Sequence, residues 1–188
     1  AVAEMRSGAA KGARNAIFIP VGTGIAAALI IDGEIRSAEG FAGEIGHINV
    51  SGKYPCVCGK SGCLEPAAST LAISKAYEGQ SGKSGTTTEE IFKLVVAGDT
   101  VATHVWNDAT AAMARACETL ITILSPEVIV FGGGLSNAGE TFLKPIRDYL
   151  ESSLTFQRMP RLEIAHYGAK AGTIGCAMLA FDRVKAGK

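Results

Sequence analysis

The spacing of apolar positions divides the chain into short strands followed by helices. Runs of four to seven apolar residues, each bounded by glycine or aspartate, are typical of buried strands. Near the N-terminus such runs predict strands over residues 16–21, 25–31 and 34–38, with Asp32-Gly33 as a hairpin turn between the last two. We expect the three strands to pair antiparallel, after a helical segment over residues 1–12 that stops at Gly12.

The rest of the chain is mostly helical in pattern after an irregular segment over residues 39–65. Apolar residues recur at helical spacing over residues 66–78, 88–97, 99–124, 140–150 and 171–184. Two further buried strands are expected at residues 127–131 and 162–165. This order predicts an α/β fold without an internal repeat or a linker.

The composition restricts the class of protein. The 188 residues are 47% hydrophobic, and 18 acidic residues balance 18 basic ones, so we expect one domain and no nucleic-acid or membrane partner. No signal peptide or transmembrane span is visible. The five cysteines do not form a disulfide framework, since Cys117 and Cys176 stand alone in apolar helical stretches; a cytoplasmic location is expected. The chain begins in a helical pattern at Ala1, as a fragment would.

Three cysteines and a histidine form the most specific pattern. Cys56, Cys58 and Cys63 lie in C-V-C-G-K-S-G-C, and His47 precedes them in A-G-E-I-G-H. Three thiolates and an imidazole are the ligand set of a closed, structural Zn²⁺ site. The alternative, three small buried residues, fits poorly with the glycines and polar residues between them.

Two glycine-rich turns and two carboxylates are weaker candidates. Gly22-Thr23-Gly24 lies between two expected strands, where it serves either as an ordinary turn or as a phosphate contact. Gly132-Gly133-Gly134 ends a buried strand, where ligands of α/β sheets bind, but no Walker A lysine follows. Glu44 and Glu65 flank the metal motif and could accept hydrogen bonds from sugar hydroxyls. His104 and His166 are expected to be structural or exposed.

Several segments together resemble the ROK family of repressors, uncharacterised open reading frames and sugar kinases. They are V-G-T-G-I-A-A-A-L-I-I-D-G-E-I, F-A-G-E-I-G-H-I-N-V, C-V-C-G-K-S-G-C-L-E, E-V-I-V-F-G-G-G-L-S and A-K-A-G-T-I-G-C-A-M-L-A. The matching region extends from Ala1 to about Ala180, and the segments follow one another in a specific order and spacing. Among ROK members the chain is most similar to bacterial glucokinases.

The resemblance implies a fold, ligands and site residues. The fold would be an actin-like ATPase domain with an RNase H-like core, and residues 1–188 would form its C-terminal lobe. ATP with Mg²⁺ would contact the turn and the strand end through Gly22, Thr23, Gly24, Gly133, Gly134 and Asn137. The hexose hydroxyls would contact Glu44, His47 and Glu65. The metal ligands would be His47, Cys56, Cys58 and Cys63, with the second ring nitrogen of His47 facing the sugar.

Two parts of the family pattern are missing. The family has an Asp-Gly-Gly-Thr phosphate loop and an Asn-Asp pair whose Asp is the general base, and both would precede Ala1. Asn107-Asp108 imitates the pair, but it follows the metal motif inside a predicted helix, so we reject it as catalytic. We therefore expect no catalytic residue in this chain and no kinase activity from the chain alone.

The resemblance leaves several functions open. ATP-dependent phosphorylation of glucose is favoured, with fructose, mannose, allose or an N-acetylated amino sugar as alternative substrates and polyphosphate as an alternative donor. A sugar-responsive repressor is the rival from another class. A homo-oligomer, dimer or tetramer, is expected. The expected helix over residues 171–184 has an apolar face, formed by Ile174, Met178, Leu179 and Phe181. We expect the isolated chain to associate through this face.

Overall fold

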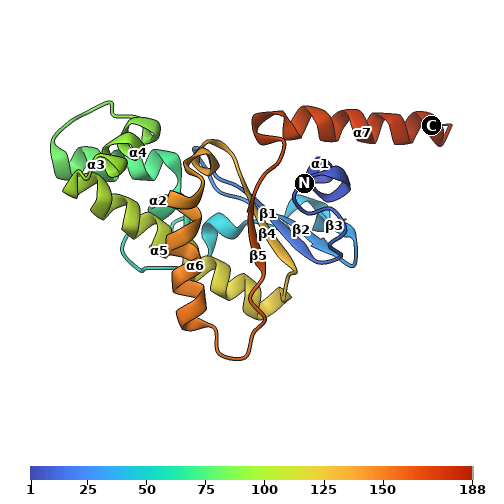
Figure 1. The fold of residues 1–188 in the computed structure, drawn as a ribbon, viewed down its shortest axis with the longest axis horizontal. Helices are drawn as coiled ribbons and strands as arrows, with labels where there is room; N and C mark the ends of the chain where they lie inside the picture. Colours follow the sequence, from blue (N-terminus) through green and yellow to red (C-terminus); the bar gives the residue numbers. More distant parts are fainter. Residues whose placement is uncertain (188) are drawn as a thin grey trace.

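A five-stranded mixed sheet organises the chain in a computed structural model that describes residues 1–187 (Figure 1). The strands are β1 (Ala16–Pro20), β2 (Ala28–Ile31), β3 (Glu34–Arg36), β4 (Val128–Gly132) and β5 (Arg161–Ile164). Their order across the sheet is β3-β2-β1-β4-β5. β1 pairs antiparallel with β2, and β2 with β3, which confirms the antiparallel opening predicted from the sequence. β1 pairs parallel with β4, and β4 with β5.

Seven helices accompany the sheet in the described part of the chain. They are α1 (Val2–Ser7), α2 (Glu65–Ala68), α3 (Thr70–Ser81), α4 (Thr88–Val96), α5 (Thr100–Leu124), α6 (Glu140–Ser153) and α7 (Ala171–Lys185). Figure 1 shows α2 to α6 grouped on one side and α1 with α7 on the other. No helix within residues 1–187 is long and apolar enough to cross a bilayer.

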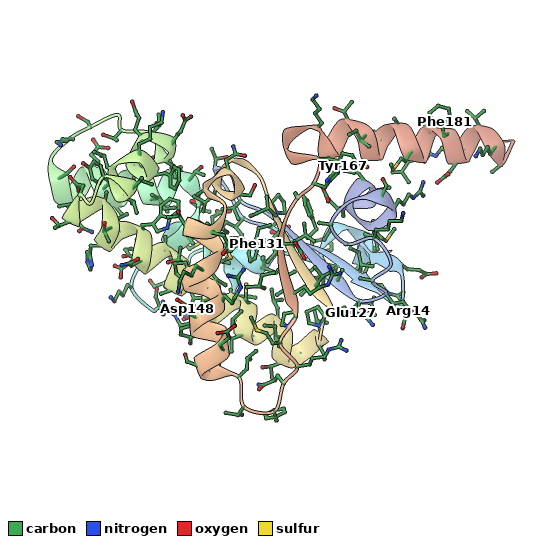
Figure 2. All side chains as sticks on the ribbon, in the orientation of Figure 1. Arg14, Glu127, Phe131, Asp148, Tyr167 and Phe181 are labelled. Atoms are coloured by element: carbon green, nitrogen blue, oxygen red, sulfur yellow. The ribbon has the colours of Figure 1, made fainter. Side chains whose placement is uncertain are left out.

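The alternation of side chains along the strands produces two apolar clusters. Ile17 and Phe131 belong to the larger cluster, and Figure 2 shows Phe131 near the middle of the molecule. Val128 and Val130 belong to a smaller cluster with residues of the α1 segment. Because neighbouring strand residues point to opposite faces, both faces of the sheet centre are buried. The larger cluster carries the elements that form the candidate site.

The helix expected over residues 66–78 is in fact two helices. Ser69 has extended backbone angles (φ −69°, ψ 159°) and separates α2 from α3. Its hydroxyl accepts a hydrogen bond from the backbone N–H of Ala72 at 3.1 Å, which caps the new helix. Helix α2 begins at Glu65, so this carboxylate lies at a helix start and not in the preceding loop.

The first helix is also shorter than expected, since it ends at Ser7 and not at Gly12. Glu4 is fully buried, and its carboxylate accepts backbone N–H groups of Ala9 at 2.8 Å, His166 at 3.1 Å and Tyr167 at 2.9 Å. A Cβ on Gly8 would lie 2.2 Å from this carboxylate. The helix therefore ends where the chain turns around the Glu4 side chain, which joins α1 to the segment before α7.

The second strand begins three residues later than expected, at Ala28. Ile25 forms only an isolated bridge with Val21, and the N–H of Ala27 donates to the carbonyl of Gly43 at 2.7 Å. Residues 22–24 therefore form a short turn closed by the Val21–Ile25 bridge, and residues 26–27 separate this bridge from β2. That turn brings Gly24 and Ile25 to the candidate site.

Helix α7 packs on α1 and extends away from the sheet (Figure 1). Gly175 is buried, and a Cβ added there would lie 3.5 Å from Val2. Ile174 and Met178 are half-buried, whereas Leu179 is 47% exposed and Phe181 is 68% exposed (Figure 2). The apolar face predicted for this helix is thus partly covered by α1 and partly open.

Candidate functional site

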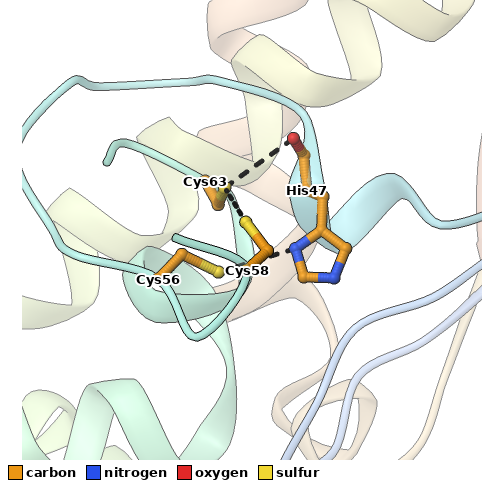
Figure 3. A group of neighbouring side chains, drawn as sticks. All are labelled: His47, Cys56, Cys58 and Cys63. Atoms are coloured by element: carbon orange, nitrogen blue, oxygen red, sulfur yellow. Dashed lines mark hydrogen bonds between the residues drawn. The ribbon is translucent and has the colours of Figure 1, made fainter. Parts of the chain in front are cut away.

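The four predicted metal ligands converge in the segment before α2 (Figure 3). One ligand atom from each of His47, Cys56, Cys58 and Cys63 lies within 4.8 Å of the others. A 3-10 turn over Ile45–His47 presents the histidine. Isolated bridges pair Asn49 with Cys63 and Pro55 with Ser61, so the loop between them folds back like a small hairpin. The spacing of the motif thus folds locally into a ligand cluster.

Glycines make this fold-back possible. Gly62 has φ +88°, and a Cβ there would lie 2.3 Å from the backbone nitrogen of Gly52. Gly59 has φ +86°, and its N–H donates to the carbonyl of Cys56 at 3.0 Å, which closes the turn between the cysteines. Positive φ angles favour glycine. The glycines between the ligands are therefore required by the backbone.

Two of the distances between ligand atoms match those of a tetrahedral zinc site. Cys58 Sγ and Cys63 Sγ are 3.7 Å apart, and Cys56 Sγ is 3.5 Å from His47 Nδ1. Zinc bound at about 2.3 Å from sulfur and about 2.0–2.1 Å from nitrogen places two sulfurs roughly 3.8 Å apart and a sulfur and nitrogen roughly 3.5 Å apart. A disulfide would need about 2.05 Å. The cluster has the donor set and spacing of a metal site, and Nδ1 is the nitrogen on the cysteine side.

The thiols have different electrostatic environments. Burial raises the pKa of the Cys63 thiol to about 11, whereas a backbone hydrogen bond involving Lys60 lowers the pKa of the exposed Cys58 thiol. A bound cation would favour both thiolates. Elsewhere, burial raises the pKa of Cys117 to about 12, which leaves that thiol inert.

Glu65 connects the metal cluster to the glycine turn. Its Oε2 accepts the backbone N–H of Ile25 at 3.0 Å, and a Cβ on Gly24 would lie only 2.7 Å from the same oxygen. Gly46, next to His47, also lies close to the Glu65 side chain: a Cβ on Gly46 would be 3.3 Å from Glu65 Cβ. The structure therefore brings together a predicted sugar carboxylate, a predicted phosphate turn and the metal cluster.

The Gly22–Gly24 turn leaves two backbone donors available. Within the described residues, the N–H of Gly22 donates to the carbonyl of Gly24 at 3.0 Å, while those of Thr23 and Gly24 carry no hydrogen bond. The carbonyl of Gly22 accepts the N–H of Thr70 at 2.8 Å, at the start of α3. Two adjacent unpaired N–H groups beside an exposed threonine hydroxyl are suited to anionic oxygens.

Two clefts meet at Thr23. The first has a volume of about 690 Å³ and contains Gly134 and Asn137 beyond the end of β4. The second, about 420 Å³, lies beside the metal loop and contains Glu65 and Cys56. Of the residues that the sequence assigned to a nucleotide, Thr23, Gly134 and Asn137 line the larger cleft.

Gly133 does not line that cleft and has another reason to be glycine. Its φ is +80°, and a Cβ would lie 2.3 Å from the carbonyl oxygen of Val21. The residue therefore allows the end of β4 to approach the end of β1. A contact between Gly133 and an adenosine stays a prediction, whereas the close approach of the two strand ends is what the structure shows.

Sequence reasoning missed the opposite wall of the larger cleft. Helix α4 contributes Thr88, Phe92 and Lys93 to it. Thr88 Oγ1 donates to the carbonyl of Thr70 at 2.8 Å, and the Phe92 ring lies 5.7 Å from that of Trp106. The only signal in the sequence was an amphipathic helix after a capping box, which describes any surface helix equally well.

The remaining candidates are dispersed. Glu44 is exposed, and its carboxylate has no hydrogen bond to a described residue. His104 is exposed and lies 3.8 Å from Asp108 on the same helix face, and His166 is exposed with its ring against Tyr167, as expected for residues outside the site. Asn107 is exposed on α5.

Known proteins resemble this chain in sequence and in fold. It is 38% identical over 197 residues to a glucokinase of Halalkalibacterium halodurans, covering 93% of this chain and 58% of that one. It is 34% identical over 165 residues to an N-acetylmannosamine kinase of Vibrio cholerae, covering 87% and 56%. A Streptomyces griseus ROK glucokinase crystallised with glucose and AMPPNP superposes with a TM-score of 0.84 at 28% identity, covering 95% and 64%.

The chain spans less than two thirds of the length of these relatives. Its α/β fold matches the actin-like ATPase fold of ROK sugar kinases, as the sequence predicted. The sequence matches the ROK family over residues 1–183. The chain therefore belongs to the ROK family.

Proposed function

We propose that the protein to which this chain belongs phosphorylates a hexose, with glucose as the first candidate and ATP as donor. The observation that carries this proposal is the hydrogen bond between Glu65 and the N–H of Ile25. The carboxylate that would accept from sugar hydroxyls lies next to the backbone donors that would contact phosphate oxygens. Phosphoryl transfer requires the two substrates to be held in this proximity.

On the sugar side, Glu65, Glu44 and His47 would contact the hydroxyls. Carboxylates accept strong, charge-assisted hydrogen bonds from hydroxyl groups. Because His47 Nδ1 lies toward the cysteines, Nε2 is the nitrogen left for a hydroxyl. Zinc held by the four ligands would fix the orientation of that ring. The metal is structural in this proposal, and a reducing cytosol would keep its thiolates available.

On the nucleotide side, Thr23 and the N–H groups of Thr23 and Gly24 would contact phosphate oxygens. The larger cleft would hold the adenosine near Gly134 and Asn137, with Gly133 shaping the strand end. Mg²⁺ bound to the phosphates would neutralise their charge. The Asn-Asp pair and the first phosphate loop would come from sequence before Ala1, so residues 1–188 would be the C-terminal lobe of the enzyme.

N-acetylmannosamine is the second candidate substrate. The similarity to the Vibrio cholerae kinase is only slightly lower than that to the glucokinase. Glu44, His47 and Glu65 address hydroxyls that several hexoses share. The choice between the sugars therefore depends on groups outside these three side chains.

The test compares the 188-residue chain with the protein encoded together with its upstream sequence. We expect ADP release with glucose from the longer protein and none from the chain alone, because in this proposal the general base comes from sequence before Ala1. If ADP release is slower with glucose than with N-acetylmannosamine, the second sugar becomes the proposed substrate. Turnover by the chain alone that disappears in Asp108→Ala would show that the base lies in this chain, and a basic helix-turn-helix upstream without turnover would favour a repressor.

A further inference from the structure

We propose that a small hollow beneath the metal loop is an effector site for a phosphorylated monosaccharide. The hollow lies between α5 and residues 50–54 and has a volume of about 290 Å³. It shares no lining residue with the nucleotide cleft, but Tyr54, Ala67 and Asp108 also line the smaller cleft that contains Glu65. Only the identity of the sugar phosphate rests on the proposed function. The preference for a phosphate group and hydroxyls is argued from the side chains that line the hollow.

One face of α5 lines the hollow. Asp108, Ala112 and Arg115 are spaced four and three residues apart, so they lie on one face of the helix. Ala112 and Ala67 contribute small side chains to the lining, and Ser51 and Tyr54 of the loop complete it. The volume is close to the lower limit of about 300 Å³ for small-molecule sites, which suits a single sugar ring with a phosphate.

One end of the hollow is cationic. Arg115 donates from Nε to the carbonyl of Val50 at 2.6 Å, and its other guanidinium nitrogens have no hydrogen bond or ion pair among residues 1–187. Lys53 also lines the hollow, and no described carboxylate forms an ion pair with it. Arg115, Lys53 and the hydroxyls of Ser51 and Tyr54 all line the hollow and are the kinds of donor that a phosphate group requires.

The other end of the hollow is anionic. Asp108 is seven residues before Arg115 on α5, which separates the two positions by roughly 10 Å along the helix. Its only described ion-pair partner is His104, at 3.8 Å. A carboxylate there would repel a second phosphate but accept sugar hydroxyls. A cationic end and a carboxylate end at this separation indicate a ligand with a phosphate at one end and hydroxyls at the other.

The hollow is coupled to the metal loop through the backbone. Val50, which accepts from Arg115, donates its N–H to the carbonyl of Gly62 at 2.7 Å, and the N–H of Gly62 donates to the carbonyl of Tyr54 at 2.7 Å. Gly62 precedes Cys63, and Glu65 follows two residues later. A ligand held by Lys53 and Tyr54 would therefore change the position of the loop that carries the sugar carboxylate.

The test is calorimetric titration of glucose 6-phosphate and of inorganic phosphate, without nucleotide, into the 188-residue chain purified without chelator. We expect glucose 6-phosphate to bind more tightly than phosphate. Lys53→Gln should weaken both by roughly tenfold, the loss of one charge-assisted contact. Asp108→Asn should weaken glucose 6-phosphate while strengthening phosphate, since the carboxylate accepts from hydroxyls and repels the anion.

Two control variants distinguish binding in the hollow from nonspecific binding to surface cations and from binding in the proposed sugar site. Lys83→Gln removes an exposed lysine in the loop between α3 and α4 and should leave both affinities unchanged. Glu65→Gln removes a contact of the proposed sugar site and should weaken glucose 6-phosphate less than Lys53→Gln does. Binding that depends on Glu65 but not on Lys53 would place the ligand in the proposed sugar site and overturn the inference, as would absence of binding or equal affinity for the two ligands. Neither outcome depends on whether the longer protein is a kinase.

Discussion

Glu65 shows how one residue unites the two halves of the candidate site. It begins α2, two residues after a metal ligand, and its carboxylate reaches the N–H of a residue 40 positions earlier. A Cβ on Gly24 would lie only 2.7 Å from the same oxygen. The side chain therefore depends on both a local turn and a distant one, and its replacement should affect sugar and nucleotide contacts differently.

In the longer protein, Glu65→Gln should raise the KM for glucose roughly 10- to 100-fold. This change corresponds to the loss of a charge-assisted hydrogen bond that contributes about 1.5–3 kcal/mol. The KM for ATP should change little, because the amide oxygen can still accept from Ile25. Steady-state kinetics with each substrate varied in turn measures both constants. An equal rise in both would mean that Glu65 mainly supports the loop.

The metal cluster provides a second prediction at this scale. Protein purified without chelator should contain about one zinc per chain, and Cys58→Ala should contain much less, because three ligands bind zinc more weakly than four. The variant should lose hydrogen-exchange protection at residues 47–65, and its affinity for sugar should fall more than its affinity for nucleotide. Elemental analysis, hydrogen exchange and ligand titration measure these effects, and Cys176→Ala, an exposed cysteine on α7, is the matched control. A metal-free wild-type protein would contradict the site.

At the scale of elements, Glu127 holds the first ends of β1 and β4 together. Its Oε1 accepts the backbone N–H groups of Arg14 and Asn15, both at 2.9 Å, one residue before the parallel pairing of Ala16 with Val128 begins. Figure 2 shows Arg14 and Glu127 at this edge. These backbone hydrogen bonds lower the pKa of the Glu127 carboxyl.

A lowered pKa makes the stabilisation dependent on pH. The carboxylate stabilises the fold above the unfolded-state pKa of about 4.3, and this stabilisation is lost as the pH falls through the lower folded-state pKa. Glu127→Gln should therefore lower Tm at pH 7, and the difference from wild type should shrink below about pH 4. Thermal melts of both proteins from pH 7 to pH 3 test this. Glu34→Gln, an exposed carboxylate on the edge strand β3, is the control and should show little difference.

At the scale of the whole molecule, α7 has a partner for only part of its surface. Helix α1 lies against one side of it, with Val2 at Gly175 and Arg6 paired with Asp182, whereas Leu179, Phe181 and Val184 stay exposed. Several exposed apolar side chains on one helix favour association. The relatives are longer than this chain, so this surface belongs to a larger protein in our proposal.

The isolated chain should therefore associate through α7. Light scattering should report a species larger than a monomer, and Leu179→Glu/Phe181→Glu should shift it to a lower mass without lowering Tm much, because neither residue is buried. Ile123→Glu, at an exposed apolar position near the end of α5, is the control. A monomeric wild-type chain would contradict the expectation, and an unchanged mass in the double variant would place the association elsewhere.

The sequence by itself determined the elements and the metal cluster. Strand and helix periodicity depends on neighbouring residues, and the four ligands lie within 17 positions of one another, so glycine turns alone can bring them together. Only the tertiary structure decided where helices break and which distant groups meet. Glu4 contacts residues 162 and 163 positions away, and α4 forms a wall of the larger cleft although nothing in its own sequence indicates a site. Such contacts depend on how the sheet and helices pack, because burial and hydrogen bonding between remote segments are properties of the folded chain and leave no local pattern.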